Sequence, residues 1–301
     1  MQQWISHLIR LEALEVLPDE PMSKYTTWKI GGPADAMVVP KTSRQLAELM
    51  RLLHAEGIPW MTIGKGSNLL VSDKGIRGCV IRLGGELEQI AFDGTEVRAG
   101  GGASTVRLSI MAGKAGLTGL EFAGGIPGTV GGAVYMNAGA HGSDVSRIFK
   151  SADIVLETGE LVTYPAEDMK FAYRHSVLHE QRGIVAQACF SLAAGDRLEV
   201  AAAMAAYKDR RRKTQPLTQP CAGSVFRNPP GDHAARLIEA AGLKGTKVGG
   251  AEVSTLHANF IVNTGQATAE DVLALMEQVK AAVQSKFGVA LVPEVFFVGE
   301  R

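Results

Sequence analysis

The chain has 301 residues, and its 46% hydrophobic and 21% charged residues are a balance typical of globular domains. Lys plus Arg and Asp plus Glu both number 31, and this zero net charge argues against an extended nucleic-acid-binding surface. The three cysteines are isolated, no apolar run has the length of a membrane span, and no signal peptide is recognisable. The composition predicts a cytoplasmic protein of two or three domains, with no membrane or nucleic-acid partner and no evident obligate protein partner.

The first region, residues 1–83, has the pattern of a small α/β unit. Its clearest element is a helix over residues 43–57, with Ser43 as the N-cap and Gly57 as the stop signal. The apolar face of this helix consists of Leu46, Leu49, Met50 and Leu53. Strands are predicted over residues 35–40, 59–64 and 79–83.

The second region, residues 84–191, has the pattern of an antiparallel sheet with one helix. The helix is predicted over residues 103–116, and Thr158-Gly159 is the expected hairpin turn within residues 152–164. Two further strands are predicted over residues 95–101 and 183–190.

The third region, residues 192–301, has the pattern of three helices and a final strand, as in an α+β domain. An alanine-rich helix begins near Leu198 and must end before Pro216. A short helix within residues 231–245 has Asp232 as its expected cap, and a long helix over residues 268–288 begins with a Thr268–Asp271 capping box. Residues 291–299 are expected to form a final strand.

Two glycine-rich loops give the strongest functional signal. Glycine inside an element lowers stability by roughly 0.5–1 kcal/mol relative to alanine, so a cluster indicates that something approaches the backbone closely. The loop TIGKGSNLLVSDKG (62–75) follows a predicted strand, and its backbone N–H groups suit a diphosphate. The residues expected to bind it are Gly64, Lys65, Gly66, Ser67 and Asn68. The second loop, EFAGGIPGTVGGAVYMNAGAHGSDV (121–145), contains neither standard nucleotide-binding signature.

A series of longer motifs identifies a family. In chain order they are TTWKIGGPAD, IGKGSNLLVSDKGIRGCVIRL, GLTGLEFAGGIPGTVGGAVYMNAGAHG, YRHS, AGSVFRNP and EVFFVG. The chain resembles the UDP-N-acetylenolpyruvoylglucosamine reductase family from roughly Tyr25 to Gly299. The resemblance implies an α+β protein with an FAD-binding fold of the vanillyl-alcohol-oxidase (PCMH) type. Its expected parts are two FAD-binding subdomains, residues 1–83 and 84–191, and a C-terminal substrate-binding domain, residues 192–301.

The resemblance also explains the glycine clusters. It implies a non-covalent FAD whose pyrophosphate lies against the GKGSN loop, with NADPH as the reductant. The second glycine-rich segment would then pack along the flavin, where side chains would collide with it. The residues of this second cofactor wall are Gly124, Gly125, Ile126, Pro127, Gly128, Gly131 and Gly132.

The implied reaction reduces UDP-N-acetylglucosamine enolpyruvate to UDP-N-acetylmuramate in peptidoglycan precursor synthesis. By resemblance, Ser224 protonates the enolate carbon, while Arg174 and Glu294 stabilise the enolate. An unactivated serine is a poor acid, so the residues alone would not have singled out Ser224. The apolar residues around Glu294 would favour the protonated form of its carboxyl group if they bury it.

Substrate contacts are expected from residues near these motifs: Tyr173, Arg211, Lys213 and Asn228. The pair His175 and His179 has no evident third ligand and the chemistry needs no metal, so no metal site is predicted. Cys221 lacks an activating histidine and is interpreted as a loop residue. The family's tyrosine-bearing lid insertion is missing between Tyr173 and Arg211, which leaves open how the enolate is shielded from water.

Two other functions remain as alternatives at this stage. One is a different flavin oxidase or dehydrogenase on the same scaffold, and the other is a non-catalytic nucleotide-sugar sensor. The presence of Ser224, Arg174 and Glu294 in their motifs argues against both.

Overall fold

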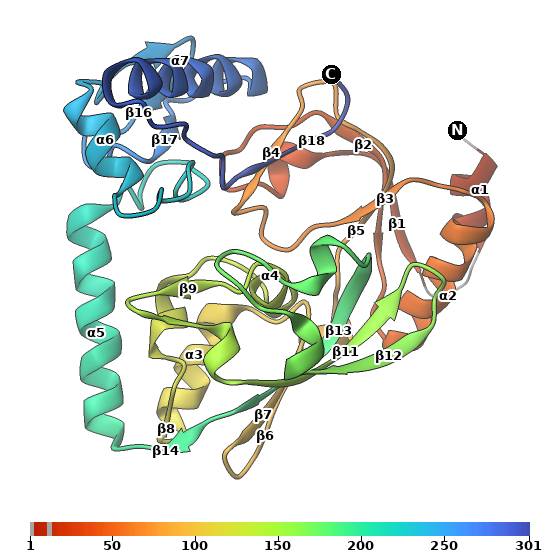
Figure 1. Cartoon of the computed structure of the whole chain (residues 1–301). Helices are drawn as coiled ribbons and strands as arrows, with labels where there is room; N and C mark the ends of the chain where they lie inside the picture. The colour runs from red at the N-terminus through yellow and green to blue at the C-terminus, as the bar shows by residue number, and fades with distance from the viewer. Residues whose placement is uncertain (1–2, 11–13) are drawn as a thin grey trace. The chain divides into compact units, whose positions relative to one another are not determined.

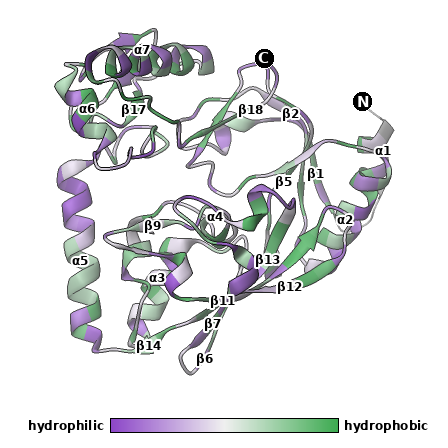
Figure 2. Ribbon diagram, in the orientation of Figure 1, coloured by the Kyte–Doolittle hydropathy of each residue, from purple (hydrophilic) through white to green (hydrophobic). Residues whose placement is uncertain are grey.

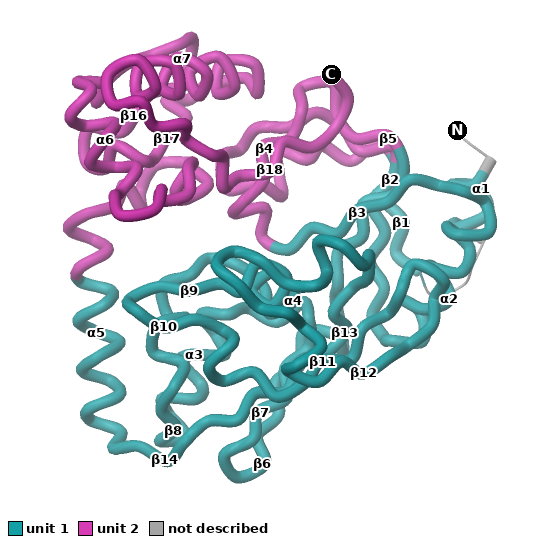
Figure 3. The backbone as a smooth tube through the Cα atoms, viewed as in Figure 1, with its two compact units in different colours: residues 1–18, 36–64, 78–209 teal, residues 19–35, 65–77, 210–301 magenta. Residues whose placement is uncertain are grey.

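The computed structural model describes residues 3–10 and 14–301, and the chain divides into two compact units (Figures 1 and 3). Unit 1 comprises residues 1–18, 36–64 and 78–209. Unit 2 comprises residues 19–35, 65–77 and 210–301. The chain therefore passes into unit 2 twice before it completes unit 1. These boundaries differ from those expected near residues 84 and 192, and the division into three domains stays a prediction.

Two sheets form the framework of unit 1. The first has the strand order β1-β2-β5-β3. One end of each of the strands β1, β2 and β5 belongs to unit 2. Its strands are β1 (Glu15–Pro21), β2 (Pro33–Val39), β3 (Trp60–Thr62) and β5 (Ile76–Ile81). The second is five-stranded and antiparallel, in the order β12-β11-β13-β7-β6. Its strands are β6 (Ile90–Asp93), β7 (Glu96–Gly100), β11 (Phe149–Leu156), β12 (Leu161–Pro165) and β13 (Gly183–Ser191).

Helices pack on both faces of the five-stranded sheet. Alternate residues of a strand point to opposite faces, and Ile154 of β11 lies in one core cluster while Val155 lies in another. The Ile154 cluster includes residues of α3 and α4, and the Val155 cluster includes the apolar face of α2. The helices of unit 1 are α1 (Gln3–Arg10), α2 (Ser43–Ala55), α3 (Thr105–Lys114), α4 (Val130–Tyr135) and most of α5 (Arg197–Thr214). Two small strand pairs complete it: β8 (Leu117–Thr118) with β14 (Ala193–Ala194), and β9 (Gly139–Ala140) with β10 (Ser143–Asp144).

Unit 2 is organised around helix α7 (Ala269–Phe287), whose ribbon in Figure 2 shows both hydrophilic and hydrophobic colours. One face of the helix is apolar, and its residues Val272, Leu275, Met276, Val279 and Val283 are all buried, while Phe287 is partly buried at the edge of the core. The rest of the unit consists of α6 (Ala234–Ala240), a three-stranded sheet and a strand pair. The sheet has the order β15 (Lys247–Val248), β16 (Ala251–Val253) and β17 (Ile261–Asn263), and the parallel pair is β4 (Leu69–Val71) with β18 (Phe296–Val298).

Three local expectations are wrong. Helix α2 is capped by Thr42 rather than Ser43, and the Thr42 hydroxyl accepts a hydrogen bond from the Gln45 N–H at 3.1 Å. Asp232 does not cap α6, because the helix begins after His233. The final strand is only three residues long and starts two residues after Glu294. A cap depends on the backbone angle at one residue, which the hydrophobic pattern does not specify.

Among the helices that the structure describes, none combines the length and hydropathy that a membrane span needs.

Candidate active site

The GKGSN loop contains two glycines that the protein's own packing requires. Gly66 is buried with φ +58°, and a Cβ atom there would lie 2.2 Å from the carbonyl oxygen of Tyr25. A Cβ atom on Gly64 would lie 2.5 Å from the hydroxyl of Thr129. Within the described part of the chain, the N–H groups of Lys65 and Gly66 donate no backbone hydrogen bond. The loop therefore presents donors, beside the exposed Lys65, that suit an anionic group.

The second glycine-rich segment begins in a short 3-10 helix, Glu121–Gly125, and continues into α4. Gly131 donates to the carbonyl of Gly101 at 2.8 Å, and a Cβ atom on Gly131 would lie 3.0 Å from that same oxygen. A Cβ atom on Gly124 would lie 3.2 Å from the Ser109 hydroxyl. Crowding within the chain is therefore one reason for glycine at Gly124 and Gly131.

Gly132 is different, because it is exposed and a Cβ atom there would make only an ordinary contact, 3.6 Å from the Thr129 hydroxyl. Glycine in a helix lowers stability by about 1 kcal/mol relative to alanine. The packing of the chain does not explain glycine at this position. A cofactor bound beside α4 would account for it, and the place of Gly132 in the cofactor wall stays a prediction.

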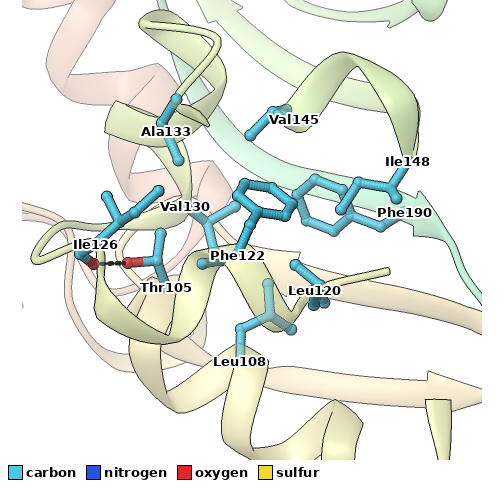
Figure 4. Close-up of a pocket in the computed structure, with 12 residues that line it drawn as sticks. Thr105, Leu108, Leu120, Phe122, Ile126, Val130, Ala133, Val145, Ile148 and Phe190 are labelled. Atoms are coloured by element: carbon cyan, nitrogen blue, oxygen red, sulfur yellow. Dashed lines mark hydrogen bonds between the residues drawn. The ribbon is translucent and has the colours of Figure 1, made fainter. Parts of the chain in front are cut away.

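An apolar cavity lies under the same segment (Figure 4). It is lined by Thr105, Leu108, Leu120, Phe122, Ala123, Ile126, Val130, Ala133, Ala138, Val145, Ile148 and Phe190. The only polar side chain in this lining, Thr105, donates its hydroxyl to the Ile126 carbonyl at 2.7 Å. No charged residue reaches the cavity, so it suits neither a pyrophosphate nor a nucleotide and belongs to the core of unit 1.

Arg174 lies at the tip of a tight turn in unit 1. Ala172 and His175 exchange two backbone hydrogen bonds, both 3.2 Å, so that Tyr173 and Arg174 form the turn between them. Arg174 has φ +55°, which is uncommon for a residue with a side chain and suggests a functional position. Its Nη2 donates to the Gly139 carbonyl at 3.1 Å, and its guanidinium lies 5.0 Å from the centre of the Tyr173 ring.

Ser224 and Glu294 lie on neighbouring segments of unit 2. The Glu294 N–H donates to the carbonyl of Val225, the residue after Ser224, at 2.7 Å. Asn68 of the GKGSN loop joins them, since its side chain donates to the Glu294 carbonyl at 3.1 Å. These two hydrogen bonds bring one end of the expected cofactor loop, the expected acid and the segment of the expected proton donor together.

The chain itself covers Glu294 only in part. Glu294 is half-buried, and the side chain of Val292 is exposed, with 55% of the residue's surface accessible. The chain by itself does not bury the carboxyl group fully, and a protonated Glu294 at neutral pH stays a prediction.

The four expected substrate contacts differ in their environments. Tyr173 is 55% exposed, and Lys213 is exposed near the end of α5. Arg211 is half-buried, donates to the Gln215 side chain at 2.9 Å, and has a pKa that burial lowers. The Asn228 side-chain oxygen accepts from the Ala234 N–H at 3.1 Å, so Asn228 satisfies the first turn of α6 in place of Asp232.

Each expected site residue belongs to one of the two units. Unit 1 holds Gly64, Gly124, Gly125, Ile126, Pro127, Gly128, Gly131, Gly132, Tyr173 and Arg174. Unit 2 holds Lys65, Gly66, Ser67, Asn68, Arg211, Lys213, Ser224, Asn228 and Glu294.

The histidine pair after Arg174 is engaged with other groups. The ring of His179 stacks on Tyr135, with centroids 4.0 Å apart, and His175 stacks on His179 at 5.0 Å. Across residues 3–10 and 14–301, no three His, Cys, Asp or Glu side chains are grouped so as to hold a metal ion. Cys221 is half-buried, and burial raises the pKa of its thiol, which opposes its use as a nucleophile.

Sequence reasoning missed two polar residues at these sites. Thr129 caps α4 by accepting from the Gly132 N–H at 3.4 Å, and its hydroxyl occupies the space beside Gly64. Asn259 is 3% exposed and hydrogen bonds to the segment after Ser224. The sequence offered one usable signal, because threonine is among the preferred N-cap residues.

The chain is similar in sequence to family models and to known proteins. Residues 34–164 match a family model described as an FAD binding domain, and residues 215–298 match the C-terminal domain of UDP-N-acetylenolpyruvoylglucosamine reductase. Reductases of that name from Bacillus licheniformis and Anoxybacillus flavithermus are 49% and 51% identical, over 100% of this chain and 100% of their own.

A solved structure of the reductase from Thermus caldophilus has a TM-score of 0.81 and 38% identity, and the match covers 95% of this chain and 98% of that one. The expected fold class, α+β with an FAD-binding domain and a C-terminal domain, is confirmed. The chain therefore belongs to the UDP-N-acetylenolpyruvoylglucosamine reductase family and is an oxidoreductase.

Proposed function

We propose that this chain reduces UDP-N-acetylglucosamine enolpyruvate to UDP-N-acetylmuramate, with NADPH as the electron donor, in peptidoglycan precursor synthesis. The observation that supports it most is the hydrogen bond from Glu294 N–H to Val225 C=O at 2.7 Å. This bond joins the backbone of Glu294 to that of the residue after Ser224, 69 positions earlier in the sequence, and so supports a site that both residues share. We keep the cytoplasmic location as a prediction.

Non-covalent FAD is the cofactor in this proposal. The donors of Lys65 and Gly66, together with the Lys65 ammonium, would hold its pyrophosphate. The segment from Gly124 to Gly132 would form the other wall, with Gly132 as the position where the cofactor rather than the chain requires glycine. When bound, FAD supplies the hydride that it has received from NADPH.

The side chains have separate roles in the addition of a hydride and a proton across the substrate's carbon–carbon double bond. Hydride on the terminal vinyl carbon leaves negative charge on the enolate that is conjugated with the substrate carboxylate. Arg174 would stabilise this charge through its guanidinium, and Glu294 through its carboxyl group. Ser224 Oγ would then give its proton to the neighbouring carbon. Tyr173, Arg211, Lys213 and Asn228 are proposed to contact the rest of the nucleotide sugar.

Rapid mixing of the purified protein in the absence of oxygen tests this proposal. NADPH should bleach the flavin absorbance, and UDP-N-acetylglucosamine enolpyruvate should restore it with formation of one UDP-N-acetylmuramate per flavin. An alcohol oxidase on this scaffold would instead be bleached by its alcohol and recover with oxygen. A sensor would bind the nucleotide sugar without a change in the flavin spectrum. Either of these results would contradict the proposed reaction.

A further inference from the structure

A buried asparagine holds the segment that follows Ser224. Asn259 is 3% exposed, and its side-chain oxygen accepts from the Phe226 N–H at 3.0 Å. Its side-chain nitrogen donates to the Phe226 carbonyl at 2.8 Å. The Asn259 backbone carbonyl also accepts from the Val225 N–H at 2.9 Å. One residue thus satisfies three backbone groups within two residues of Ser224, and only one orientation of the amide serves both groups of Phe226.

The other edge of this segment pairs with the residues around Glu294. Glu294 N–H donates to Val225 C=O at 2.7 Å, and Arg227 N–H donates to Val292 C=O at 2.9 Å. The Phe226 side chain is 2% exposed and lies in the core of unit 2. The strip from Ser224 to Arg227 is therefore held on one edge by Asn259 and on the other by the Glu294 segment.

We propose that Asn259 is a positioning residue for substrate reduction, which sets the Ser224 hydroxyl relative to Glu294 by holding the backbone of Phe226. This inference rests on the proposed function, because it assigns proton donation to Ser224. Loss of the Asn259 amide would leave two buried backbone groups of Phe226 without their partner, and the strip would shift to satisfy them. A displacement of about 1 Å in a catalytic group can lower a rate about 100-fold.

Reoxidation of the reduced, flavin-loaded enzyme by UDP-N-acetylglucosamine enolpyruvate is the step to measure. Asn259→Ala should slow it about 100-fold, while bleaching of the flavin by NADPH stays within a few-fold of wild type. Asn263→Ala is the matched control, because Asn263 is also buried in unit 2 and donates to the Trp28 carbonyl at 2.9 Å. This control should lower the melting temperature and leave the reoxidation rate of loaded enzyme unchanged.

Asn259→Asp adds a readout that general destabilisation would not produce. An ionised carboxylate accepts from Phe226 N–H but repels Phe226 C=O, whereas a protonated carboxyl group can serve both. The reoxidation rate of Asn259→Asp relative to wild type should therefore rise as the pH falls. His257 is a titratable group in contact with Asn259: its Nδ1 accepts from the Asn259 N–H at 3.3 Å, and burial lowers its pKa. Dividing the reoxidation rate of Asn259→Asp by that of wild type at each pH removes the effect of His257 titration that both proteins share.

Ser224→Ala separates the two possible failures. If Ser224→Ala reoxidises at the wild-type rate, the proposed proton donor is wrong and the role of Asn259 falls with it. If reoxidation is slow in Ser224→Ala but has the wild-type rate in Asn259→Asp at every pH, only the positioning role of Asn259 is wrong. Equal slowing of both half-reactions in Asn259→Ala would also overturn the positioning role of Asn259. A flavin reoxidation in Asn263→Ala that is slower than in wild type would overturn it too.

Discussion

The glycine-rich segment of residues 121–132 and the paired segments 224–227 and 292–294 are two regions with opposite construction. The first offers a glycine-rich backbone, and two of its glycines, Gly124 and Gly131, lie where a Cβ atom would crowd other atoms of the chain. The second offers two side chains, Ser224 and Glu294, beside hydrogen-bonded backbone groups of Val225 and Arg227. Substitutions in the first region therefore act by adding atoms, and substitutions in the second act by removing a functional group.

The largest effect is expected for Ser224→Ala. Removal of a positioned proton donor should slow reoxidation of the reduced flavin by the enolpyruvyl substrate about 10²–10⁴-fold. Flavin content and bleaching by NADPH should stay near wild type, because neither needs a proton on the substrate carbon. Ser285→Ala, an exposed position on α7, is the control and should change neither half-reaction. If both half-reactions slowed equally in Ser224→Ala, Ser224 would be structural.

Gly66→Ala should have the next largest effect. Gly66 and Gly57 have nearly the same backbone angle, φ +58° and +63°, but only at Gly66 would a Cβ atom collide with backbone. Both substitutions carry the left-handed penalty of about 1–2 kcal/mol. Gly66→Ala should lose about 1–3 kcal/mol more through overpacking, together with flavin. Urea unfolding of the two variants measures the difference, and equal losses would remove the case for close packing at Gly66.

Gly132→Ala should change stability and flavin binding in opposite directions. Alanine fits the exposed helical position, so the flavin-free protein should gain about 0.5–1 kcal/mol. Flavin binding should weaken, because the added methyl group meets the cofactor. Thermal unfolding of the flavin-free protein and titration with FAD provide the two measurements. Unchanged affinity for FAD would mean that α4 does not border the cofactor.

The smallest effect is expected for Asp271→Asn in helix α7, which lies in the same hydrophobic core of unit 2 as Phe226. Asp271 of the α7 capping box accepts from the N–H groups of Thr268 and Gly250, and these bonds lower its pKa. A lowered pKa means that the stabilisation is complete above the ordinary value of about 3.9 and is lost as the pH falls through the lowered value. Asp271→Asn should therefore cost about 0.3–1 kcal/mol at neutral pH. The difference from wild type should vanish in acid, and a difference that persists there would contradict a charge effect.

Elements with complete local signals could be predicted from the sequence alone. The capping box of Thr268 and Asp271 and the apolar stripe behind it define α7 without any distant partner. The hairpin of β11 and β12 turns at Gly159, which has φ +81°, a conformation that glycine adopts without strain. Caps such as Asn228, which satisfies Ala234 from six positions away, could not be predicted because they depend on how the chain folds back.

The sequence by itself determined the family and the two glycine-rich loops, because those motifs are contiguous and specific, and it named three expected catalytic residues whose roles stay predictions. The tertiary structure decided which glycines the chain needs for its own packing, since Gly66 meets Tyr25 from 41 positions away while Gly132 meets nothing closer than 3.6 Å. It also decided that Asn259 holds Phe226, a pair 33 positions apart. Such contacts follow from the folded path of the backbone, which no local pattern of residues records.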